Sequence, residues 1–137
     1  MPFQWLEMRI TEERDRRERE AEILSRLGPA LGEFQRIIGD CLKTYTDAFG
    51  EEAATVRREA GGLTVRVENP PGQVRIATDT KLPGFQVERE GAPLAIEIGL
   101  LPGNKLFYRD VATDQFVTMD ELMRRILDRV LFPKLRD

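Results

Sequence analysis

Residues 55–117 alternate apolar and polar side chains in short runs, and turns that contain Gly and Pro separate these runs. A period of two is typical of half-buried strands, in which one face of a sheet is covered and the other faces water. The pattern therefore predicts an antiparallel meander of about five strands. The clearest runs are residues 63–68, 73–79, 85–90, 94–100 and 105–110, with a short edge strand within 55–58 and a stub at 116–117.

The turn at residues 69–72 predicts the register of the first hairpin. Pro71 and Gly72 do not fit comfortably into a ladder, so we place both in the turn. The resulting pairs are Val67 with Val74 and Val65 with Ile76 on the inner face, and Arg66 with Arg75 on the outer face.

A second hairpin is predicted to turn near Gly91. A turn there pairs Phe85 with Ile96 and Val87 with Leu94, which continues the apolar face. In the strand at 105–110, the consecutive residues Leu106, Phe107 and Tyr108 leave open which side faces the core.

Two amphipathic helices flank the predicted sheet. Residues 29–50 form the first helix and residues 118–132 the second, and both have apolar side chains three or four positions apart. The second helix opens with a capping box from Thr118 to Glu121 and ends at Phe132 and Pro133. With both helices packed on one face of the meander, residues 1–137 make a single α+β domain.

Residues 1–28 predict a charged helical extension of that domain. Between Thr11 and Glu22 every residue is polar except Ala21, so this helix has no apolar face of its own. Gly28 and Pro29 predict that it ends before the next helix starts. Residues 3–10 fit a strand or a helix, and we favour a helix, although Thr11 as an N-cap favours an extended segment before it.

Charge and hydropathy narrow the range of partners. The net charge is −3 and both signs are interspersed, so there is no overall field to hold nucleic acid or an anionic membrane. No apolar stretch approaches 18 residues and no signal-peptide pattern is present. We therefore expect a cytoplasmic protein that binds neither nucleic acid nor a membrane.

The chain has no histidine and one cysteine. This composition excludes a His-containing catalytic triad and a zinc site of His and Cys within one chain. Cys41 falls on the apolar stripe of the first helix, where a small buried side chain is expected. We therefore predict that the protein is not an enzyme and has no metal or other cofactor.

Arginines on the predicted first strands form one candidate site. Arg57, Arg58, Arg66 and Arg75 could read a carboxylate or phosphate group as an anion-binding or partner-binding site. The alternative is that carboxylates on the same wet face neutralise them; these are Glu68, Glu88 and Glu97.

The N-terminus carries the second candidate site. Its apolar residues form a candidate interface with the chain's own sheet or with a second subunit, and they are Phe3, Trp5, Leu6, Met8 and Ile10.

Two functions follow from these patterns. The first is a non-catalytic interaction or scaffold module for a protein partner, which we expect to be a homodimer. The alternative is a domain that binds a small ligand or an anion in a pocket between helices and sheet, with Tyr45, Tyr108 and Arg109 as polar groups.

Overall fold

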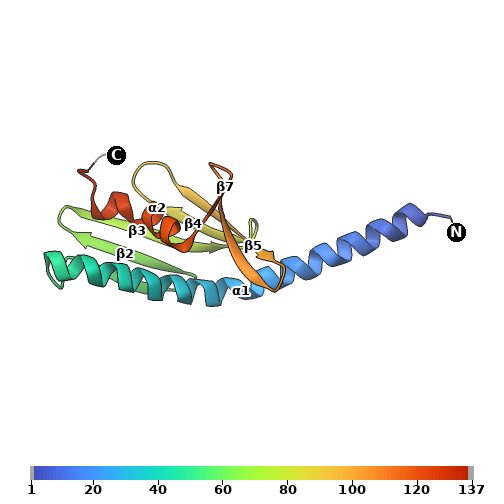
Figure 1. The fold of residues 1–137 in the computed structure, drawn as a ribbon, viewed down its shortest axis with the longest axis horizontal. Helices are drawn as coiled ribbons and strands as arrows, with labels where there is room; N and C mark the ends of the chain where they lie inside the picture. The colour runs from blue at the N-terminus through green and yellow to red at the C-terminus, as the bar shows by residue number, and fades with distance from the viewer. Residues whose placement is uncertain (1, 136–137) are drawn as a thin grey trace.

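The structure is a computed structural model that describes residues 2–135. In chain order its elements are α1 (Gln4–Phe49), β1 (Ala54–Glu59), β2 (Gly62–Glu68), β3 (Pro71–Asp79), β4 (Gly84–Glu88), β5 (Leu94–Leu101), β6 (Lys105–Asp110), β7 (Gln115–Val117) and α2 (Met119–Leu131). The predicted α+β class is confirmed (Figure 1). The ends of the predicted domain, residue 1 and residues 136–137, lie outside the described range.

The described strands form one antiparallel sheet in the order β1 to β7. There are seven strands, so the predicted count of about five is too low. The segment predicted as a possible edge strand forms β1, and the predicted stub forms β7, which has only three residues. These two strands are the edges of the sheet.

The first hairpin differs in register from the prediction. Val65 pairs with Val74 and Arg66 pairs with Gln73, so Arg66 does not lie opposite Arg75. The strand β3 already starts at Pro71, because a proline is tolerated as the first residue of a strand. The slip is two residues, so every inward side chain stays on the inner face.

The second hairpin has the predicted register. Phe85 pairs with Ile96, and Val87 pairs with Leu94. The next pairing resolves the ambiguity in β6, because Tyr108 lies opposite the buried Ile98. Leu106 and Tyr108 therefore face the core, and Phe107 faces outward over Gly99.

α1 is one continuous helix, and the predicted break at Gly28 and Pro29 is wrong. An internal proline lacks an N–H and costs about 3 kcal/mol in a helix. Leu27 and Leu31 on either side of Pro29 are buried in the core, and packing of this kind supplies most of the stability of a helix in a protein. Tertiary contacts therefore keep α1 helical at Gly28 and Pro29, where the local sequence favours the end of a helix.

The start of α1 answers the question left open for residues 3–10. The helix begins at Gln4, so the helical interpretation is confirmed and the strand is excluded. Thr11 is not an N-cap, since its hydroxyl donates to the carbonyl of Glu7 at 3.1 Å within the helix.

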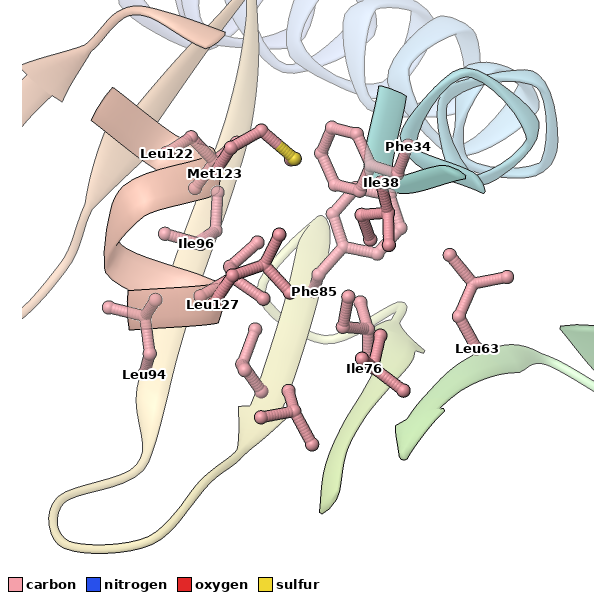
Figure 2. Packing of buried hydrophobic residues seen from close by; sticks show 14 of the residues in the cluster. Phe34, Ile38, Leu63, Ile76, Phe85, Leu94, Ile96, Leu122, Met123 and Leu127 are labelled. Carbon is pink, nitrogen blue, oxygen red and sulfur yellow. The ribbon is translucent and has the colours of Figure 1, made fainter. Parts of the chain in front are cut away.

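The core lies between the helices and the inner face of the sheet. Figure 2 shows Phe34 and Ile38 of α1 and Leu122 and Met123 of α2 pointing into one cluster, with Phe85 of β4 between them. The rings of Phe34 and Phe85 are 4.7 Å apart. The strands contribute their alternating inward residues: Leu63, Val65, Val67, Val74, Ile76, Phe85, Val87, Leu94, Ile96 and Ile98.

Only the C-terminal part of α1 belongs to this core. The first buried residue of the helix is Leu27, and none of residues 4–26 is buried. We call residues 4–26 the projecting segment, because most of it extends beyond the sheet (Figure 1). At its base, Ile23 and Leu24 still touch the core and Arg26 donates to the Asn104 carbonyl at 2.8 Å.

α2 is capped and tied to the sheet through polar contacts. The predicted cap forms, with the Thr118 hydroxyl accepting from the Glu121 amide at 3.2 Å. Arg125 donates to the buried Asp110 at 2.6 Å and to Gln115 at 3.0 Å. These bonds join the helix to the β6–β7 hairpin.

Within residues 2–135, no helix combines the length and the apolarity that crossing a bilayer requires.

Replacing Phe34 with Ala should lower the free energy of unfolding by about 3–5 kcal/mol, because the ring is fully buried and its removal leaves a cavity. Urea denaturation followed by circular dichroism measures this loss. Phe116→Ala is the matched control, since that ring is 71% exposed, and should cost about 1 kcal/mol or less. Equal losses in the two variants would contradict the position of the core.

Candidate functional site

The outer face of the sheet brings together three of the four predicted arginines. The pairings place Arg57, Thr64, Arg75 and Glu88 in one row across β1 to β4. Arg66 lies two positions from Thr64 on β2, on the same face. Three guanidinium groups therefore surround one threonine.

Arg58 does not belong to this group. It pairs with Leu63, which is buried on the inner face, so its side chain leaves β1 on the opposite side from Arg57. Its Nη1 atom lies 3.9 Å from the position that a Cβ on Gly32 of α1 would occupy. Arg58 therefore lies beside the helix, away from the outer face.

The carboxylates on this face neutralise the arginines only in part. Arg75 approaches Glu59 at 3.9 Å, and Glu97 pairs with Arg109 at 3.0 Å. Among the described residues, neither Arg57 nor Arg66 forms an ion pair. These two guanidinium groups are therefore available to a carboxylate or phosphate from outside.

Thr64 is the residue of this site that sequence reasoning missed. It is 5% exposed, and its hydroxyl has no hydrogen-bond partner in the described part of the chain. Burying an unpaired hydroxyl costs about 1–3 kcal/mol. Because Val65 faces the core, the alternation along the strand predicts that Thr64 faces outward. Its position between Arg57 and Arg75 follows only from the pairing of three strands.

A small hollow adjoins the row on the outer face. It has a volume of about 70 Å³, and the small residues Gly62 and Ala77 lie in it beside Arg75. A side chain on Gly62 would not fit, since its Cβ would lie 2.4 Å from the Ile76 carbonyl oxygen. The hollow therefore adjoins the arginine row through Arg75, which lines it.

The predicted pocket residues are not brought together. Tyr45 packs against Phe49, with ring centroids 4.9 Å apart, at the C-terminal end of α1. Tyr108 packs on Phe34 in the core, and burial raises the pKa of its hydroxyl.

Arg109, the third predicted pocket residue, lies on the outer face and pairs with Glu97 and Asp114. The middle of the space between helices and sheet is occupied by packed side chains such as Phe34, Phe85 and Ile96 (Figure 2). Of the three predicted pocket residues, Tyr45 lines an open hollow, which has a volume of about 1310 Å³ and lies between the C-terminal ends of α1 and α2 and the sheet.

Cys41 lacks the environment of a reactive thiol. Burial raises the pKa of the Cys41 thiol, and the nearby Asp40 carboxylate adds to the effect. The thiol is therefore protonated and weakly nucleophilic at neutral pH. Within residues 2–135, no three potential ligands among Cys, Asp and Glu converge in a way that could hold a metal ion.

The candidate interface residues form an exposed apolar end of α1. Trp5 is 66% exposed, and its neighbours are exposed as well; they are Phe3, Leu6, Met8 and Ile10. None of the five reaches the core cluster. Of the two contacts predicted for them, the contact with the chain's own sheet is therefore wrong.

Ion pairs stabilise the middle of the projecting segment. Arg16 bonds to Glu13 at 2.8 Å and to Glu20 at 2.5 Å, and Arg17 bonds to Glu13 at 3.1 Å. Hydrogen bonds from Arg16 and Arg17 lower the pKa of Glu13 to about 2. Glu13 is therefore a carboxylate throughout the physiological pH range.

No protein-family model matches this chain, and searches of curated proteins and of solved structures find no significant match.

Replacing Thr64 with Val should raise the free energy of unfolding by about 1 kcal/mol, because the change removes an unpaired buried hydroxyl and keeps a β-branched side chain. Urea denaturation measures the change. Thr55→Val on the neighbouring strand is the control, since Thr55 is exposed, and should leave stability nearly unchanged. A clear loss of stability in Thr64→Val would mean that the hydroxyl has a partner in solution.

Proposed function

We propose that this protein is a non-catalytic interaction module that docks on a protein partner through the projecting segment of α1. One observation carries the proposal: the body (residues 27–135) exposes four large apolar residues far apart in the sequence, whereas the start of α1 exposes five within residues 3–10. Contiguous apolar surface of this kind marks interaction sites. Recognition through a helix that packs on a partner is a recurrent mode of protein–protein binding.

The projecting segment is better suited to a protein than to a bilayer. A helix that lies on a membrane needs a consistently basic polar face. Here, carboxylates such as Glu13 and Glu20 alternate with the arginines and pair with them. The segment therefore has no charge preference for anionic lipid.

Site-specific photo-crosslinking in the native cell tests this function. A photoreactive amino acid at Leu6 should give covalent protein adducts, because Leu6 lies in the exposed apolar end. The same group at Asp15, an exposed polar position farther along the helix, is the control and should give few. If position 6 gives no adduct with any protein, including a second copy of this chain, the proposed function is wrong.

A second candidate function is anion binding at the outer face of the sheet. It is supported by the unpaired guanidinium groups of Arg57 and Arg66 next to the buried, unpartnered hydroxyl of Thr64. The ligand class is a phosphate or carboxylate group, which guanidinium forks recognise in pairs of hydrogen bonds. This site is separate from the projecting segment, so both functions can coexist.

Titration calorimetry with inorganic phosphate at low ionic strength tests the anion site. Binding should be lost in Arg57→Gln/Arg66→Gln, since the two charges that face the solution are removed. Arg14→Gln/Arg19→Gln is the matched control, because it removes the same charge from the projecting segment. Equal binding by the two double variants, or none by the original protein, would refute the site.

A further inference from the structure

We infer that the projecting segment of α1 pairs with the same segment of a second copy of this chain, in antiparallel orientation and centred near residue 15. The inference rests on the proposed function and names its partner. It depends on which side chains share one side of the helix, on their sizes, and on the order of their charges.

One strip of the projecting segment has apolar ends and a charged centre. Side chains three or four positions apart lie on one side of a helix. Leu6 and Ile10 form one apolar end, and the other is formed by Ala21 and by Leu24, which is half-buried against the chain's own core. Between them the strip carries charged residues, of which Glu13 and Arg17 occupy successive positions. Trp5 and Met8 lie on another side of the helix and outside this strip.

Antiparallel pairing matches the two ends of the strip by size. If two copies cross near residue 15, Leu6 lies opposite the second copy's Leu24, and Ile10 lies opposite its Ala21. Phe3 then lies at the level of the second copy's Leu27 and Gly28. A Cβ on Gly28 would meet nothing within 4 Å, so the helix surface there is open to a large ring. Each large side chain at the N-terminal end of the strip therefore faces a position on the second copy that can accommodate it.

The charged residues at the centre of the strip favour the antiparallel orientation over the parallel one. In the antiparallel pair, Glu13 of each copy faces Arg17 of the other, which gives two attractive contacts. In a parallel pair, Glu13 would face Glu13 and Arg17 would face Arg17, and like charges at facing positions are destabilising. Because its pKa is about 2, Glu13 stays ionised at physiological pH.

The length of the projecting segment is also consistent with a crossing near residue 15. Leu27 is the first residue of α1 buried in the body, and the segment before it spans roughly 34 Å at 1.5 Å per residue. With the crossing at residue 15, residue 3 of each copy reaches residue 27 of the other. The two helices therefore overlap along the whole projecting segment, and the two bodies lie at opposite ends of the pair.

Charge reversal tests the contact. Glu13→Arg and Arg17→Glu should each sediment as monomers, with about half the mass of the original protein, because each brings like charges together. An equimolar mixture should restore the dimer mass, since the arginine introduced at position 13 of one variant then meets the glutamate introduced at position 17 of the other. Circular dichroism checks that both variants keep their helix. A mixture that stays monomeric would overturn the inference.

Electron–electron distance measurement tests the orientation. A spin label on Gln4→Cys, in a Cys41→Ala background, should give a distance of about 33 Å between copies in the antiparallel pair. A parallel pair would bring the labels to about 10 Å, the spacing of packed helices, and would overturn the inference.

The same measurements separate this inference from the proposed function. If the original protein is a strict monomer at tens of micromolar, while photo-crosslinking at Leu6 still gives adducts with another protein, the self-pairing is wrong and the interaction module stands. If position 6 gives no adducts at all, both fail.

Discussion

The burial of one side of the C-terminal half of α1 is the contact on which the rest of the molecule depends. Phe34 and Ile38 are fully buried against the inner face of the sheet, so the C-terminal half of α1 is held in position. Because α1 continues through Pro29 without a break, the same contact fixes the direction of its free half. The sheet, α2 and the C-terminal half of α1 therefore form one packed unit, from which the projecting segment extends.

Alternation along the strands separates the core face of the sheet from its outer face. Inward side chains such as Val65 and Ile76 are enclosed, and their neighbours Thr64 and Arg75 belong to the other face. Changes at exposed outer positions such as Arg57 and Arg66 therefore do not reach the core, whereas Thr64 is buried on that same face. Arg57 and Arg58 illustrate how strict this division is, since adjacent arginines of one strand lie on opposite sides of the sheet.

The sequence predicted those features that depend on local patterns. Periodicity located α2 and its Thr118 cap, and alternation gave the pairing of Phe85 with Ile96. It failed where distant residues decide the outcome. Local signals at Gly28 and Pro29 favoured a break that burial of Leu27 and Leu31 overrides, and the burial of Thr64 depends on side chains from two other strands.

The two edges of the sheet limit how copies of this protein can associate. β7 is only three residues long, and α1 packs along β1, whose own side chains include adjacent arginines. Short or charged edge strands discourage main-chain hydrogen bonding with a neighbouring molecule. Sheet-to-sheet polymerisation through either edge is therefore disfavoured, although an apolar helix end is exposed.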